Sequence, residues 1–429
     1  MASVGEEFER ATAYELLDED IESFKLLVGA DTAVSMSEYI TTATPDAIRN
    51  FARAVGDDNP LWFTEHYGDG TRWGSQIAPP VMAEIINAPL RGDPLPPEVK
   101  ERTRGLFRGI HVYVSGGSWE FYRPIYPGDR LYSFGGYESV EVKESEYADR
   151  SVIRVRRYVK MNQRAEVVAV SRTVAILTER KKARDKGKYR DVQPASYSDE
   201  ELAEIDRIYE SEKPRGSETR WWEDVEVGEA LPAMAKGPLT ETEIIVFHAG
   251  GYGFAPYWPS ASRLAYQNRR RIPAFYVKNE GGIPDVAQRV HWDSKWAQAI
   301  GNPMAYDYGV MRETWLHHML TDWIGDDGWP VTLDVSIRKF NYIGDTQLLS
   351  GEVVGKRQVG PRCYVDLELR ATNQRAEVTA PASATVLLPS REHGAVVLPD
   401  PPDELRTKAL EMMRRHDELS ASSEGHPHQ

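Results

Sequence analysis

The sequence predicts an α+β fold built from two similar halves, in each of which an antiparallel sheet wraps one long helix. Two short sequence patterns occur twice, in the same order, along the chain. In each copy, segments with apolar residues at helical spacing precede several segments in which apolar and polar residues alternate. The length of 429 residues also favours two domains over one, because a single core stops growing at roughly 250–300 residues.

The composition is that of an ordinary globular protein and narrows the possible functions. Hydrophobic residues make up 41% of the chain and charged residues 28%, and no apolar run approaches the ~20 residues that span a bilayer. The formal net charge of −14 argues against a nucleic-acid-binding surface, which needs clustered Lys and Arg. We therefore expect no membrane span and no nucleic-acid partner.

Cysteine usage and the first residues both indicate a cytoplasmic protein. Cys363 is the one cysteine of the chain, which excludes an intramolecular disulfide and a multi-cysteine metal site and fits a reducing compartment. The start of the chain, MASVGEEFERATAYELL, is acidic and lacks the apolar run of a signal peptide. We expect a cytoplasmic location.

The two repeated patterns define the two copies. The first is an aromatic-rich run that ends in Gly-Asp, and its aspartates, Asp129 and Asp345, are 216 residues apart. The second is the hexapeptide NQRAEV, which occurs at 162–167 and again at 373–378, 211 residues apart. The similar spacings predict tandem copies with small differences in length.

The predicted elements follow in the same order in each copy. An amphipathic helix comes first, with Thr44 as the N-cap of TPDAIRNFARAVG and Thr240 as the N-cap of TETEIIVFHAGG. A longer helix comes next, at 80–90 (PVMAEIINAPL) in the first copy and at 309–325 (GVMRETWLHHMLTDWIG) in the second. Alternating segments such as RSVIRVRRYVKM and CYVDLELRAT then predict the sheet.

Four segments, which together reach across nearly the whole chain, carry a family resemblance. They are GDDNPLW (56–62), IAPPVM (77–82), WEDVEVGEALP (222–232) and VHWDSKWAQAIGNPMAYDYGVM (290–311). They resemble the MaoC-type (R)-specific enoyl-CoA hydratase/dehydratase family, and the first half resembles the FAS1-type dehydratase-like halves of its tandem members. The resemblance implies a tandem (double) hot-dog fold and a lyase that hydrates an α,β-unsaturated acyl-CoA, or runs the reverse dehydration, without a cofactor.

The resemblance and the charge pattern set the expected domain boundaries. Residues 1–180 form the first module, 181–218 a linker, 219–398 the second module and 399–429 a polar C-terminal tail. The basic run ERKKARDKGKYR at 179–190 is interpreted as solvated linker, with contact to the phosphates of a CoA tail as the alternative.

In the family signature an Asp, an Asn-Pro pair and a His follow a short helix. The first copy keeps Asp57 and Asn59 but has Trp62 in place of the His, so the resemblance implies a catalytically degenerate first half. Alignment of the long-helix starts at an offset of 229 residues places Trp62 on His291. The resemblance therefore implies that His291 is the catalytic histidine.

The second copy has no carboxylate at the aligned position that would supply the partner of His291. The same offset places Asp57 on Val286, and Asp285 stands one position earlier. Hydration of an unsaturated thioester needs a base that activates water and an acid that protonates the α-carbon. We expect Asp285 to share this work with His291, with Asp293 as the reserve.

The long helix of the second copy supplies the remaining candidates. Gly309 occupies the glycine position that the family uses for oxyanion donors at the helix start, and Tyr308 precedes it as a candidate substrate contact. His317 and His318 lie inside the helix, where one is expected to face the core. Because they lack the i, i+4 spacing of a helical metal-binding pair, no metal site is predicted.

The second copy also contains an insertion of 33 residues, at about 251–284, which is rich in aromatic residues, Arg and Pro. Its position before His291 predicts a lid or pocket wall, with an ordinary surface excursion as the alternative. Loss of the signature His can leave space in the first half for a bulky acyl chain, or Trp62 can fill that space. Both alternatives remain open.

Two other functions and the oligomeric state also remain open. Thioester hydrolysis occurs on the same fold, and a carboxylate near a bound thioester can serve it. A non-catalytic acyl-CoA-binding or stabilising protein is consistent with one copy lacking the His and the other lacking the aligned Asp. A homodimer is expected, although a tandem chain can satisfy the pairing of hot-dog modules internally.

Overall fold

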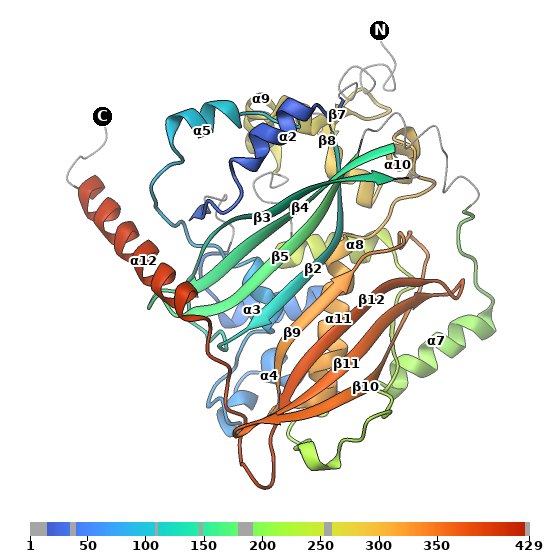
Figure 1. The fold of residues 1–429 in the computed structure, drawn as a ribbon. Helices are drawn as coiled ribbons and strands as arrows, with labels where there is room; N and C mark the ends of the chain where they lie inside the picture. The colour runs from blue at the N-terminus through green and yellow to red at the C-terminus, as the bar shows by residue number, and fades with distance from the viewer. Residues whose placement is uncertain are drawn as a thin grey trace.

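One continuous antiparallel sheet of ten strands organises the molecule (Figure 1). The computed structural model describes residues 15–34, 40–107, 110–145, 149–178, 192–252 and 260–424. The strand order is β1-β3-β4-β5-β2-β9-β12-β11-β10-β6, so each copy contributes five neighbouring strands. The strands are β1 (Thr32–Ala33), β2 (His111–Phe121), β3 (Leu131–Ser145), β4 (Asp149–Asn162) and β5 (Val167–Thr178), followed by β6 (Met234–Lys236), β9 (Trp329–Ser336), β10 (Gln347–Val359), β11 (Arg362–Asn373) and β12 (Val378–Leu388).

The two copies meet at the β2–β9 ladder in the middle of the sheet. Gly116 pairs with Ser336, and the antiparallel register continues to Glu120 and Thr332. Each copy thereby covers an edge strand of the other, which removes two exposed sheet edges. The pairing that hot-dog modules need is satisfied inside the chain, and the homodimer stays a prediction.

Helix α11 (Gly309–Ile324) is the long helix predicted for the second copy. Thirteen of its sixteen residues are buried, so the helix has no solvent-facing side. Strands β9 to β12 cover it from the second copy, and β2 and α3 (Pro45–Val55) cover it from the first. One helix therefore serves the cores of both copies.

The long helix predicted at 80–90 in the first copy does not form, and this prediction is wrong. The segment starts as the short 3₁₀ helix η2 (Pro80–Glu84) and then becomes extended. The backbone N–H of Ala88 donates to the carbonyl oxygen of Leu131 at 2.6 Å, so it pairs with the sheet and not with its own helix. Pro89 also disfavours helical geometry for the residue before it.

The first predicted helix of each copy is confirmed, as α3 and α8 (Glu241–Phe247). Thr44 Oγ1 accepts a hydrogen bond from the Ala47 N–H at 3.1 Å, which caps α3. Thr240 and Glu243 form a reciprocal capping box at the start of α8. One apolar face of each helix is buried in the main core, with Ile48, Phe51, Ala52 and Val55 from α3 and Ile244 and Phe247 from α8.

The remaining described helices are short, except for the last. None of the helices in the described ranges is long and apolar enough to cross a membrane. They are α2 (Asp18–Lys25), α4 (Pro60–Phe63), η1 (Tyr67–Gly70), α5 (Pro97–Arg102), α7 (Asp199–Ser211), η3 (Trp222–Asp224), η4 (His248–Tyr252), α9 (Ser262–Arg271), η5 (Pro273–Phe275), η6 (Ala287–His291), α10 (Ser294–Ala299) and α12 (Asp403–Glu424).

Helix α12 occupies most of the segment that was expected as a polar tail, 399–429. Leu405 and Ala409 are buried in a cluster with residues of β3, β4 and β5, so α12 docks on the sheet of the first copy (Figure 1). Their spacing of four residues is that of one helix face. The basic run at 179–190 lies outside the described residues, and α7 lies within the predicted linker.

The repeated sequence patterns form one structural unit in each copy. Asp345 accepts hydrogen bonds from the Tyr342 N–H at 3.0 Å, from Gln374 Nε2 at 2.7 Å and from Arg375 Nη1 at 2.7 Å. Gly-Asp and NQRAEV therefore meet across the sheet, and their repetition reflects a structural unit and not a repeated active site.

The same contacts are weaker in the first copy. Asp129 accepts from the Tyr126 N–H at 2.9 Å and from Gln163 Nε2 at 3.3 Å, and Arg164 Nη1 is 3.6 Å away. The two copies thus provide a matched pair of buried aspartates that differ in their contact with arginine.

We expect Asp345→Asn to lower the free energy of unfolding by about 2–3 kcal/mol and Asp129→Asn by about 1 kcal/mol, because only Asp345 loses a close charge-assisted bond to arginine. Chemical denaturation of the two variants beside the wild type measures the difference. Equal losses would show that the arginine contact adds nothing to stability.

Candidate active site

The start of α11 brings together three residues that the sequence singled out. Helix η6 places the imidazole of His291 against Tyr308, with 3.9 Å between the ring centroids. Tyr308 is the N-cap residue of α11, and Gly309 is its first residue. His291 Nδ1 also lies 2.9 Å from the carbonyl oxygen of Tyr306. The histidine is therefore held on two sides at the helix N-terminus.

These contacts fix the chemical state of His291. A carbonyl oxygen only accepts hydrogen bonds, so Nδ1 carries the ring proton and donates it to Tyr306. The lone pair of the ring is then on Nε2. Burial lowers the pKa of His291 to about 4, with the neighbouring His248 as a smaller contribution. The imidazole is neutral at pH 7 and can act as a base.

The helix start adds hydrogen-bond donors beside this base. The Tyr308 side chain does not cap α11, and the N–H groups of Gly309 and Val310 donate to no acceptor among the described residues. Free N–H groups at a helix N-terminus favour negative charge. The arrangement can stabilise an oxyanion next to a neutral imidazole.

Two further residues of this site were missed by the sequence analysis. His248 Nδ1 lies 3.3 Å from the Tyr308 hydroxyl, and the two rings stack. Gln288 lies in η6 and is 5% exposed, and its amide interacts weakly with the Tyr308 phenol but makes no regular hydrogen bond among the described residues. A buried amide without well-formed hydrogen bonds is costly and marks a place where a polar ligand fits. Its position one helical turn before His291 was the available signal.

The insertion contributes to the positioning of His291. Strand β7 (Tyr276–Lys278) pairs with β8 (Pro284–Val286) directly before η6. The buried Arg289 donates to the carbonyl oxygen of Val277 at 3.0 Å and so fastens this hairpin to η6. Residues 253–259 of the insertion lie outside the described residues, and its role as a lid or pocket wall stays a prediction.

The two predicted carboxylates lie in this hairpin and in the following helix. Asp285 is half-buried, and its Oδ1 accepts from the N–H of Val286 at 2.7 Å. Asp293 is the N-cap of α10, where it accepts from the Trp296 N–H at 3.0 Å and pairs with Arg289. Neither carboxylate hydrogen-bonds to His291 in the described part of the chain.

A large pocket adjoins the helix start. Its empty volume is about 1140 Å³, and its wall includes Ile337 and Phe340. Ile337 lies 3.6 Å from the point where a Cβ on Gly309 would be, and the Phe340 ring packs on Tyr306 with 4.7 Å between centroids. The pocket wall thus contacts residues at the start of α11, although His291, Tyr308 and Gly309 do not line the pocket. Three basic side chains, Lys143, Arg338 and Lys339, line it together with the acidic Glu144, and Lys143 and Lys339 pair with Glu141 and Glu377.

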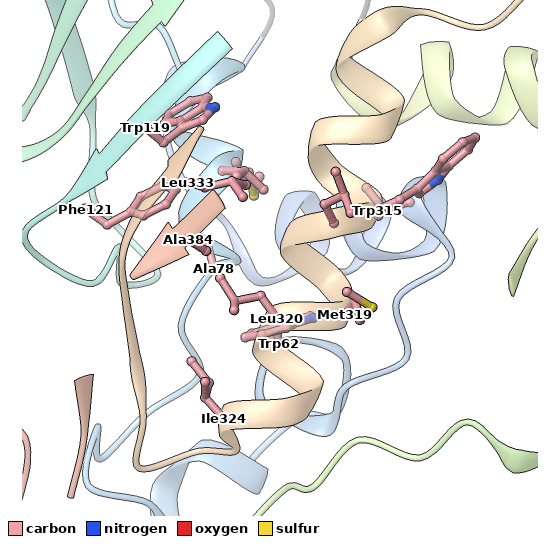
Figure 2. Close-up of a cluster of buried hydrophobic side chains, with 14 of the residues drawn as sticks. Trp62, Ala78, Trp119, Phe121, Trp315, Met319, Leu320, Ile324, Leu333 and Ala384 are labelled. Atoms are coloured by element: carbon pink, nitrogen blue, oxygen red, sulfur yellow. The ribbon is translucent and has the colours of Figure 1, made fainter. Parts of the chain in front are cut away.

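The degenerate signature of the first copy is packed into the core. Trp62 is 2% exposed and lies beside Leu320 and Ile324 of α11 (Figure 2). The pocket next to it, which Asn59 and Trp62 line, has an empty volume of only about 300 Å³. Of the two alternatives for this half, the structure favours the one in which Trp62 fills the space.

Asp57 of this signature instead faces the second copy. His318 Nε2 lies 3.4 Å from Asp57 Oδ1 and 3.2 Å from Asp322 Oδ2, and Lys236 Nζ lies 2.8 Å from His318 Nδ1. Burial raises the pKa of Asp57, raises the pKa of Asp322 to about 7 and lowers the pKa of His318 to about 4. Sequence reasoning missed this cluster. His317 is buried as well, so both histidines face the interior.

Comparison with known proteins gives both a family-model match and similar folds. Residues 27–171 match the model described as FAS1-like, dehydratase domain region. A solved structure named MaoC-like dehydratase is 16% identical, with a TM-score of 0.56 over 85% of this chain and 99% of that chain. A putative MaoC domain protein dehydratase from Chloroflexus aurantiacus J-10-fl is 13% identical, with a TM-score of 0.50 over 85% of this chain and 96% of that chain.

No curated protein matches the sequence. Because the sequence identities to the solved structures are low, the similarity establishes the fold alone. The tandem hot-dog fold predicted from the sequence is confirmed. The chain therefore has a tandem hot-dog fold, and residues 27–171 of its first half match the FAS1-like dehydratase domain region.

Proposed function

We propose that this protein adds water to an α,β-unsaturated acyl-CoA thioester, or removes water in the reverse direction, at the site formed by His291 and the start of α11. One observation carries the proposal. The neutral imidazole of His291 contacts Tyr308, the N-cap residue of α11, and the next two N–H groups, those of Gly309 and Val310, donate to no acceptor among the described residues. Hydration of a conjugated thioester needs this combination of a base and an oxyanion donor.

The residues supply each step of the reaction. His291 Nε2 takes a proton from a water molecule, whose oxygen forms a bond to the β-carbon. The electron pair of the carbon–carbon double bond moves toward the thioester, and the negative charge on its oxygen is stabilised by the N–H groups at the start of α11. The protonated His291 then gives its proton to the α-carbon, which restores the neutral imidazole.

The adjoining pocket supports a CoA thioester as the substrate. Its basic residues, Lys143, Arg338 and Lys339, can pair with phosphates, and Phe340 and Ile337 give it an apolar wall toward the site. Thr178, the last described residue before the basic run at 179–190, lines the same pocket. We therefore propose that the basic run at 179–190 also contacts the phosphates of CoA.

A carboxylate acting with His291 is a further part of the proposal. Asp285 is the first candidate, because its carboxylate is half-buried and makes its described hydrogen bond only to the adjacent backbone. Asp293 is occupied as a helix cap and as the partner of Arg289. Asp293→Asn is therefore expected to act mainly on stability.

The first test is hydration of a panel of short, branched and bulky trans-2-enoyl-CoAs by the wild type, His291→Ala and Asp285→Asn. We expect loss of at least about 100-fold in kcat for His291→Ala, the size of a general-base contribution. Loss in both variants would support Asp285 as the carboxylate. If Asp285→Asn keeps its activity, His291 alone takes the proton from water and gives it to the α-carbon.

Product analysis of the same reactions distinguishes the alternatives. Release of free CoA would indicate thioester hydrolysis, and binding without turnover of any substrate would indicate a non-catalytic acyl-CoA-binding protein. A His291→Ala variant as active as the wild type would contradict the assigned site.

The pH dependence of kcat/KM gives a second test. The base must be neutral to act, and the pKa of His291 is about 4, so activity should stay level from about pH 8 to about pH 5 and fall as the pH drops further. An inflection near the ordinary histidine pKa of about 6.5 would contradict a buried imidazole in this role.

Gln288→Leu should separate function from stability. Removal of a buried amide without well-formed hydrogen bonds should raise the free energy of unfolding by about 1 kcal/mol and lower hydration about tenfold or more, if the amide holds water or the thioester. Gln76→Leu is the matched control, because its buried amide donates to the Trp62 carbonyl at 2.6 Å and its loss should destabilise the protein. Destabilisation by Gln288→Leu would show that the amide is structurally paired.

A further inference from the structure

The polar cluster between the two copies lies at a second place on α11, in the C-terminal half of the helix. Asp57 comes from the first copy, and His318 and Asp322 come from the second. We propose that these three residues bind one divalent transition-metal ion, with zinc(II) as the best fit. The ion would join the two copies through the helix that they share.

The three ligands combine a local pair with a long-range contact. His318 and Asp322 are four residues apart on α11, so both side chains lie on one face of the helix. Asp57 follows Gly56, the left-handed C-cap of α3, and reaches the same point from the other copy. No metal site was predicted from the sequence because His317 and His318 are adjacent and are not four residues apart. The pair with the four-residue spacing is His318 and Asp322.

The distances match a metal site better than a hydrogen bond. His318 Nε2 is 3.2 Å from Asp322 Oδ2 and 3.4 Å from Asp57 Oδ1. Two ligand atoms that each lie about 2.0–2.1 Å from a tetrahedral zinc ion are about 3.3–3.4 Å apart. Hydrogen bonds between a charged pair are shorter, at about 2.7–2.9 Å.

The free atom of the cluster also points to a missing partner. His318 is 2% exposed, and its Nε2 makes no hydrogen bond although two carboxylates lie close to it. One ligand atom from each of the three residues lies within 4.8 Å of the others. A buried imidazole nitrogen between two carboxylate oxygens is the arrangement that a bound cation satisfies.

The charges of the cluster favour a divalent ion. The side chains of Asp57 and Asp322 are 3% and 10% exposed, so both carboxylates have lost most of their water. Lys236 lies within 4 Å of neither carboxylate among the described ion pairs and instead contacts His318 Nδ1 and, at 3.2 Å, the carbonyl oxygen of Gly56. The ammonium of Lys236 only donates, so His318 Nδ1 accepts its hydrogen bond and Nε2 carries the ring proton when no metal is bound. Zinc(II) at Nε2 requires that proton to move to Nδ1 and Lys236 to donate to the carbonyl oxygen of Gly56 instead.

A small pocket lies near the cluster. Asn59 Nδ2 lies 3.5 Å from Asp322 Oδ1, and Asn59 and Thr321 line this pocket. Three protein ligands leave the fourth position of a tetrahedral ion for a water molecule.

The test measures zinc(II) binding to the full-length protein after treatment with a chelator. Isothermal titration and elemental analysis should show one ion per chain, and cobalt(II) in its place should give the visible absorption of a tetrahedral site. We expect His318→Ala and Asp322→Asn to weaken binding at least tenfold, since even changes around a metal ligand cost about 10–100-fold. Metal should also raise the Tm of the wild type.

Two controls make the result specific. His317→Gln alters the adjacent buried histidine, which takes no part in the cluster, and should bind zinc(II) as the wild type does. All variants are compared in a His426→Ala/His428→Ala background, because those two histidines can bind zinc(II) by themselves. The proposal would be overturned if the His426→Ala/His428→Ala protein bound no stoichiometric zinc(II). It would also be overturned if His318→Ala and Asp322→Asn in that background bound zinc(II) as tightly as the protein without them.

Discussion

The burial of α11 on every side is the constraint on which the rest of the structure depends. A helix covered by both copies cannot direct its polar residues to solvent, and each of them needs a partner in the interior. Arg312 Nε lies 2.9 Å from Asp307 Oδ2, and Arg312 Nη1 donates to the carbonyl oxygen of Lys339 at 2.7 Å. The N-terminus and the C-terminal half of the same helix then form the two polar centres of the molecule.

The missing helix of the first copy explains why one helix can be shared. The segment that should have formed it is drawn into backbone pairing with the sheet, and the space is filled by α3, α4 and large apolar side chains. Trp62 packs against α11 in this space (Figure 2). The Trp73 and Trp329 rings, which lie 5.4 Å apart, line the same small pocket as Trp62. The indole of Trp62 thus fills the space in the first half.

The sequence predicted the features that depend on local pattern. The repeats located the two copies, and the capped helices formed where Thr44 and Thr240 start them. Alignment of the copies singled out His291, which contacts Tyr308 at the start of α11, and its catalytic role stays a prediction. It did not predict features that arise from tertiary contact. The segment after η2 is extended because Ala88 pairs with Leu131 of the sheet. Asp57 and His318 belong to different copies and meet only in the folded chain, so no local sequence pattern predicts their contact.

The two centres differ in access, and this difference bears on their roles. The start of α11 lies near Ile337, which lines a pocket with an empty volume of about 1140 Å³, and His291 is held there as a neutral base. The residues of the cluster around His318 are buried, and the pocket near it, lined by Asn59 and Trp62, is small. Asp57 and Asp322 are buried beside His318, and burial raises the pKa of both carboxyl groups. Because an isolated buried carboxylate is costly, the cluster needs a proton on a carboxyl group, the charge of Lys236 or a bound cation to offset it.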